Sequence, residues 1–108
     1  MGVAGHDIVP YAVFRAALDA GDLRRVRHLA RQMPGIGLRD ALQICLLMRG
    51  LDGYERAAVR WLGRFALESP QVDLDAIQAA AVALDALPER PQLAMERLAG
   101  ICAGCGVA

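Results

Sequence analysis

Glycine and proline residues divide this chain into six segments, and each segment has the composition of an α-helix. Of the 108 residues, 56% are hydrophobic but only 5% are aromatic, so Ala and Leu must supply most of the core. Both are strong helix formers, whereas β-branched residues, which favour strands, are few. We therefore predict a single all-α domain over residues 1–108, with about six helices.

The boundaries of these helices follow from local stop and start signals. Gly21 suits a left-handed C-cap, Asp22 suits an N-cap, and Asp52 with Glu55 resembles a capping box. Asp73 and Asp75 are expected to supply negative capping charge at the start of the fifth helix. The expected helices cover approximately residues 8–20, 22–33, 38–49, 53–68, 73–87 and 91–102.

Two patterns predict which helices form the core. The segment 41–48 is apolar on nearly every side, which is typical of a helix with protein all around it. Trp61 and Phe65 fall by their spacing on the apolar side of the fourth helix. We therefore expect the third helix to be central and both aromatic side chains to be buried.

The predicted loops are short, so consecutive helices are expected to pack as antiparallel hairpins at about 8–34, 38–69 and 72–105. The stretch "VRHLARQM" at 26–33 recurs as "VRWLGRFA" at 59–66, and "DALQ" at 40–43 recurs as "DAIQ" at 75–78. This spacing matches one helix-turn-helix unit of a solenoid. Chance similarity in a sequence rich in Ala, Leu and Arg is the alternative.

In its period and its helical hairpins the chain resembles tetratricopeptide-type repeats, although the Trp, Gly, Tyr and Pro positions of that motif are not matched. The resemblance is one of architecture and not of family membership. It implies a short, right-handed, solenoid-like stack of three hairpins with a groove on one side. Because the chain is so apolar, we expect a second copy to cover one open end, giving a homodimer or other homo-oligomer.

Charge is distributed unevenly along the chain. The 12 basic residues are all Arg and are balanced by 12 acids, yet residues 15–64 carry a net charge of +5 and residues 65–108 a net charge of −4. This bipolar distribution favours an antiparallel dimer or a head-to-tail contact between copies.

Six arginines form two stripes on the second and fourth helices, and we predict that they bind a partner. Like charges at this spacing repel one another, so acidic neighbours, an acidic or apolar protein surface, or nucleic-acid phosphates should compensate them. A solvated face with local pairs, such as Asp52 or Glu55 with Arg56, is the simplest alternative. Nucleic acid is less favoured than protein, because the net charge is zero. The six residues are Arg24, Arg27, Arg31, Arg56, Arg60 and Arg64.

Cys102 and Cys105 form a C-x-x-C motif, so a metal-binding or redox module is a further alternative to the protein-interaction role. The motif follows a helix, where the dipole disfavours a thiolate. A zinc site would need further ligands from the scattered Cys45, His6 and His28. We expect Cys102 and Cys105 to be free thiols on a frayed end, with Cys45 buried, and His28 to be packed or half-exposed.

Several functions are disfavoured by what the sequence lacks. It has no Ser/His/Asp set, P-loop or G-x-G-x-x-G motif. It also has no apolar run long enough for a membrane span and no signal-peptide pattern. An odd number of cysteines suits a reducing compartment. We therefore expect a cytoplasmic, non-enzymatic protein-protein interaction or adaptor module that uses no cofactor or metal and has no membrane partner.

Overall fold

The computed structural model describes residues 10–108, and this part of the chain contains six α-helices and no strand. The all-α prediction is therefore confirmed. The predicted start of the first helix, at residue 8, lies outside the described residues. The helices are α1 (Tyr11–Ala20), α2 (Leu23–Ala30), α3 (Leu38–Leu47), α4 (Tyr54–Glu68), α5 (Leu74–Ala86) and α6 (Pro91–Gly104).

Three of the predicted helix caps are present. Gly21 ends α1 in the left-handed region, with a φ of 71°, which costs little without a Cβ atom. The Asp22 carboxylate accepts a hydrogen bond from the Arg25 amide at 3.2 Å, at the start of α2. Asp73 accepts one from the Ala76 amide at 2.8 Å, at the start of α5. Each carboxylate satisfies an amide that has no partner within its helix.

Several helix ends differ from the prediction: α3 ends at Leu47 instead of near residue 49, and α6 ends at Gly104 instead of near residue 102. The N-cap of α4 is Gly53, without a side-chain hydrogen bond, so the capping box predicted from Asp52 and Glu55 is wrong. Helix α2 ends at Ala30 instead of near residue 33. After Ala30 the amides of Gln32 and Met33 donate to carbonyls three residues earlier instead of four. Pro34 follows, and a proline disfavours a helical conformation of the residue before it.

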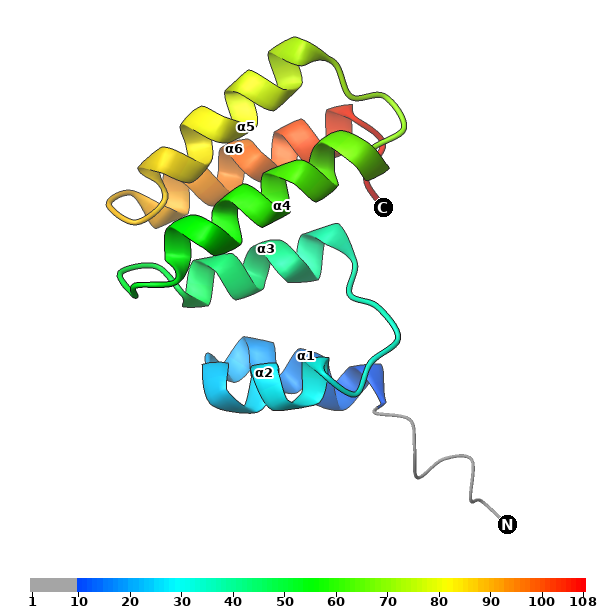
Figure 1. The fold of residues 1–108 in the computed structure, drawn as a ribbon, viewed down its shortest axis with the longest axis vertical. Helices are drawn as coiled ribbons and strands as arrows, with labels where there is room; N and C mark the ends of the chain where they lie inside the picture. The colour runs from blue at the N-terminus through cyan, green and yellow to red at the C-terminus, as the bar shows by residue number, and fades with distance from the viewer. Residues whose placement is uncertain (1–9) are drawn as a thin grey trace.

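The helices pack mainly against their neighbours along the chain, in a body of 50 × 30 × 20 Å (Figure 1). Helices α1 and α2 lie at one end, and α5 and α6 at the other. Helix α3 lies between α2 and α4, as the apolar segment 41–48 predicts, and Ile44 on α3 packs against the hydrophobic clusters on both sides.

The main core lies among α3, α4, α5 and α6, with Trp61 near its centre. Trp61 is 2% exposed and stacks on Phe65 with ring centroids 5.3 Å apart. Its indole Nε1 donates a hydrogen bond to the Leu38 carbonyl at 2.7 Å. The burial predicted for both aromatic side chains is confirmed, and the hydrogen bond ties α4 to the first residue of α3.

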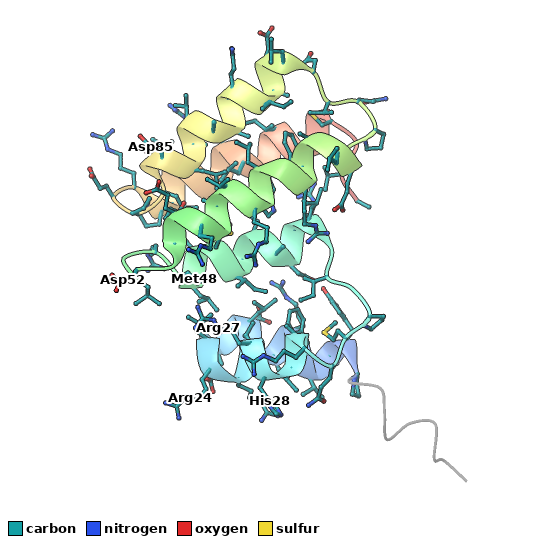
Figure 2. All side chains as sticks on the ribbon, viewed as in Figure 1. Arg24, Arg27, His28, Met48, Asp52 and Asp85 are labelled. Carbon is teal, nitrogen blue, oxygen red and sulfur yellow. The ribbon has the colours of Figure 1, made fainter. Side chains whose placement is uncertain are left out.

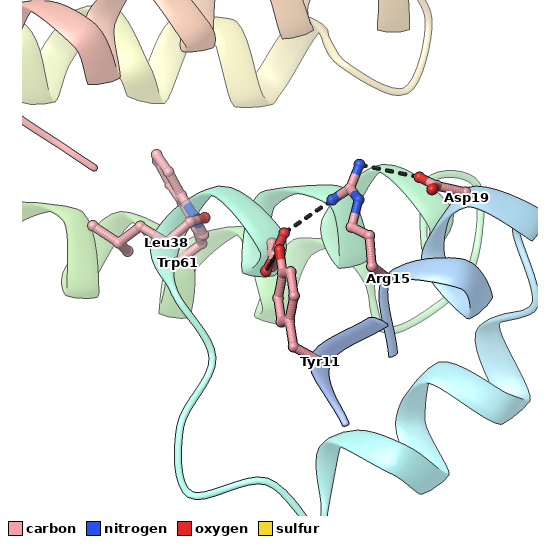
Figure 3. A network of polar contacts seen from close by, with 6 residues as sticks. Tyr11, Arg15, Asp19, Leu38 and Trp61 are labelled. Carbon is pink, nitrogen blue, oxygen red and sulfur yellow. Dashed lines mark hydrogen bonds and ion pairs between the residues drawn. The ribbon is translucent and has the colours of Figure 1, made fainter. Parts of the chain in front are cut away.

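A second, smaller core lies between α1 and α2. Its buried members pack against Ile44 and Leu47 of α3. Asp40 of α3 adds a polar tie: it accepts hydrogen bonds from the Tyr11 hydroxyl at 2.8 Å and from Arg15 at 2.9 Å (Figure 3). The buried members are Phe14, Ala17, Leu18, Val26 and Leu29.

The burial pattern does not support the 33-residue register of the proposed repeat. That register aligns Val26, which is fully buried, with Val59, which is 65% exposed. It also aligns His28, which is exposed, with the buried Trp61. Duplicated helices in equivalent positions would bury equivalent residues, so the match between "VRHLARQM" and "VRWLGRFA" reflects shared composition more than shared packing.

We predict that Trp61→Phe lowers the free energy of unfolding by about 1–3 kcal/mol, because the variant loses a buried hydrogen bond and leaves core volume unfilled. Urea unfolding followed by far-ultraviolet circular dichroism measures this, since the variant has no Trp fluorescence. Val59→Ala, on the exposed side of the same helix, is the control and should change stability by less than about 0.5 kcal/mol. Equal effects of the two substitutions would contradict the role given to Trp61.

We also predict that the protein loses stability between about pH 9 and pH 12. Burial raises the pKa of Tyr54 from 10.0 to about 12, and charged Cys45 and Asp85 contribute less. Its hydroxyl donates to the Leu84 carbonyl at 2.7 Å, a bond that the ionised form cannot make. Burial also raises the pKa of the Cys45 thiol from 9.0 to about 11.

Because the folded state holds these protons more tightly than the unfolded state, the stabilisation is complete below about pH 9 and is lost as the pH rises through the folded pKa values. Urea unfolding at several pH values measures the slope. Tyr54→Phe should flatten the upper part of the curve, and an unchanged curve in that variant would refute the assignment.

Candidate functional site

Helix α4 has an apolar side and a basic side. Arg56, Arg60 and Arg64 lie four residues apart and therefore follow one side of the helix. Trp61 and Phe65 occupy the side that faces the core. The burial of the aromatic side thus fixes the direction in which the arginines point.

A groove of about 420 Å³ lies beside this basic side. Arg56, Arg60 and Arg64 line it from α4, and Arg27 lines it from α2. Figure 2 shows Arg27 on the side of α2 that faces α3 and α4. The apolar lining residues are Ile36, Ala41, Ile44, Cys45, Met48, Ala57 and Trp61.

Arg64 is held within the chain. Its guanidinium donates two hydrogen bonds to the Glu68 carboxylate, at 2.7 and 3.0 Å, and one to the Ile36 carbonyl at 2.7 Å. Hydrogen bonding between the two side chains raises the pKa of Arg64 and lowers that of Glu68. Arg64 therefore fastens the segment between α2 and α3 to α4 and closes one end of the groove.

The other three arginines of the groove have no such partner. Within residues 10–108 the arginines that form ion pairs are Arg15 and Arg64, so the local pair predicted between Arg56 and Asp52 or Glu55 is not formed. The groove consequently combines an apolar floor with positive charges that no described carboxylate neutralises.

The structure divides the six predicted site residues into two sets. Arg27, Arg56, Arg60 and Arg64 share the groove, whereas Arg24 and Arg31 are exposed and do not line it. Arg24 lies in the first turn of α2, and Arg31 follows its last residue. In Figure 2 Arg24 lies on the opposite side of α2 from the groove, as does His28. Instead of being packed or half-exposed, His28 is exposed and contacts Gln32 at 3.2 Å.

Sequence reasoning missed the floor of the groove. Ile44 and Met48 belong to the segment that was predicted to be surrounded by protein, and Ile36 to a loop. The sequence did indicate that α3 has spare apolar surface such as Ile44, because a helix that is apolar all round has more apolar surface than two neighbours cover. Only the placement of α2 shows which part of that surface stays open.

The C-x-x-C motif is placed differently from the prediction. Cys102 is 0% exposed and Cys105 is 5% exposed, so neither lies on a frayed end. The Gln71 amide donates to the Cys105 carbonyl at 3.1 Å, which ties the C-terminal segment to the loop before α5. Gly106, with a φ of 77°, packs against Pro70 in the same loop.

The thiols of Cys45 and Cys102 have little tendency to ionise. Burial raises the pKa of Cys102 and raises that of Cys45 to about 11. Residues 10–108 contain no cluster of three or more His, Cys, Asp or Glu side chains able to hold a metal ion. His6, a further ligand considered above, lies outside the described residues.

No known protein family, curated protein or solved structure matches the chain. In the part of the chain that the structure describes, no helix is both long enough and apolar enough to cross a membrane. The function of the groove therefore has to be inferred from its own residues.

We predict that all three cysteines react slowly with a thiol reagent at pH 8 in the native protein and rapidly in urea. The physical reason is that burial excludes the reagent from all three thiols, and that it also disfavours the thiolate of Cys45 and Cys102. A colorimetric disulfide reagent counts the accessible thiols directly. Fast labelling of Cys102 or Cys105 in the native state would restore the frayed-end interpretation.

Proposed function

We propose that this chain is a protein-interaction module whose groove binds an acidic, amphipathic segment of a partner protein. The observation that carries the proposal is the set of three arginines, Arg27, Arg56 and Arg60, that surround an apolar floor without a described carboxylate partner. An amphipathic helix satisfies both parts of such a groove, since its apolar face covers the floor and its carboxylates meet the arginines. The charges would both select the partner and contribute to its affinity.

The proposal extends to the arrangement of the helices. We interpret the pairs α1–α2, α3–α4 and α5–α6 as three hairpins in a short, right-handed, tetratricopeptide-like stack. Closest packing between consecutive helices supports this interpretation. A groove on one side of the stack is the usual binding surface of helical repeat proteins.

A binding role without catalysis accords with the lining of the groove. Its lining residues include no carboxylate and no histidine, and its one nucleophile is Cys45. The Cys45 thiol points to the Ala57 carbonyl, at 3.7 Å, and its raised pKa keeps it protonated at neutral pH. We accordingly propose a non-enzymatic adaptor that uses no cofactor and works in the cytoplasm.

The first test is binding of a fluorescent amphipathic helical peptide that has Leu on one face and Glu beside it. We expect Arg56→Ala with Arg60→Ala to raise the Kd for this peptide by about tenfold or more, because both lost cations face the peptide's carboxylates. The matched control is Arg24→Ala with Arg31→Ala, which removes two arginines outside the groove and should leave the Kd within about twofold. Fluorescence anisotropy measures both.

A scrambled peptide of the same composition keeps the charge but loses the apolar face, so it should bind weakly. Equal effects of the two double variants, or equal binding of the two peptides, would refute the proposed groove. Single-stranded and duplex nucleic acids are tested in parallel at about 50 and 200 mM salt, where phosphate contacts lose most affinity. Tight binding that collapses with salt would replace the protein partner with a nucleic acid.

A further inference from the structure

Helix α5 presents a second surface that no other part of the described chain covers. Leu74 is 69% exposed and Val82 is 64% exposed, although both are large apolar side chains. Asp75, Gln78 and Asp85 are exposed on the same helix. At about 100° per residue, these five side chains fall within an arc of about 100°, so they form one continuous strip. We refer to these five residues as the acidic strip.

The acidic strip differs from every other helix surface in the described chain. Helices α1, α3, α4 and α6 each carry both acids and arginines, and α2 carries arginines without acids. Among the helices of residues 10–108, only α5 carries acids without a basic residue. Asp73, immediately before α5, is used as its N-cap, which leaves Asp75 and Asp85 without a described partner.

We propose that the acidic strip of one copy of this chain docks into the arginine-lined groove of a second copy. This inference rests on the proposed function and names the partner of that site. The strip offers what the groove requires, namely carboxylates beside exposed apolar side chains on one face of a helix. Charge complementarity connects the two surfaces, because Arg27, Arg56 and Arg60 line the groove and Asp75 and Asp85 belong to the strip.

The dimensions of the two surfaces agree. Helix α5 has 13 residues and is about 20 Å long, and the wall of the groove from Gly53 to Arg64 is about 18 Å long at the same rise per residue. The surfaces also lie toward opposite ends of the molecule: α2 borders the groove at one end, and α5 lies at the other (Figure 1). Contact between two different surfaces at opposite ends is heterologous, so assembly proceeds head to tail and leaves a free groove and a free strip at its ends.

Sedimentation velocity of the full-length protein over a range of concentrations tests this assembly. We expect the wild type to form species larger than a monomer as the concentration rises. Arg56→Glu with Arg60→Glu, and separately Asp75→Arg with Asp85→Arg, should each raise the dissociation constant for self-association at least tenfold. An equimolar mixture of the two variants should associate again, since each reversed surface then meets a complementary one. Arg24→Glu with Arg31→Glu changes the net charge equally outside the groove and should associate like the wild type.

A variant without a charge change separates specific docking from general attraction between oppositely charged molecules. Leu74→Gln with Val82→Gln keeps every charge, and both side chains are exposed, so the fold should be unaffected. We expect this variant to lose self-association as well. If this variant associates as strongly as the wild type, the proposal is overturned. It is also overturned if mixing the two charge-reversed variants does not restore association.

The same variants separate this inference from the proposed function. The strip variants keep a wild-type groove and should still bind the acidic peptide. A wild type that stays monomeric at every concentration but binds the peptide would overturn self-docking and leave the proposed function standing. If the wild type self-associates but does not bind the peptide, and Arg56→Glu with Arg60→Glu leaves self-association unchanged, both the self-docking and the proposed function are refuted.

Discussion

The burial of Trp61 connects the core of this protein with its groove. The indole stacks on Phe65, donates a hydrogen bond to the Leu38 carbonyl, and contributes to the apolar floor of the groove. Once this side of α4 faces α3, the arginines four residues apart must follow another side of the helix. The position of one aromatic side chain therefore sets both the packing of α3 against α4 and the direction of the basic stripe.

The positive charge of the groove results from how acids are distributed among the helices. Helix α2 has no acidic residue, and α4 uses Glu68 to hold Arg64. Five of the other eleven acids follow Glu68 and lie on or next to α5 and α6. Guanidinium groups stay charged at any relevant pH, so Arg27, Arg56 and Arg60 keep a positive rim over an apolar floor. This combination is the basis of the binding role that we propose for the groove.

The width of the groove depends on how helices α1 and α2 are attached to α3. These two helices have their own small core and meet α3 through Ile44 and Leu47. Two polar ties supplement these apolar contacts: Asp40 with Tyr11 and Arg15 on α1, and Arg64 with the carbonyl of Ile36 in the connecting segment. They fix the wall that carries Arg27 relative to the wall that carries Arg56 and Arg60.

The sequence by itself determined six helices, their order and most of their ends, because Gly21, Asp22 and Asp73 act on backbone groups only a few residues away. It also determined the burial of Trp61 and Phe65, since helical periodicity assigns them to the apolar side. Only the tertiary structure decided that Arg27 joins Arg56 and Arg60 while Arg24 does not, that Cys102 is buried, and that the 33-residue match lacks equivalent packing. The physical reason is that a helix's own sequence defines its faces, whereas the positions of its neighbours decide which parts of those faces are covered.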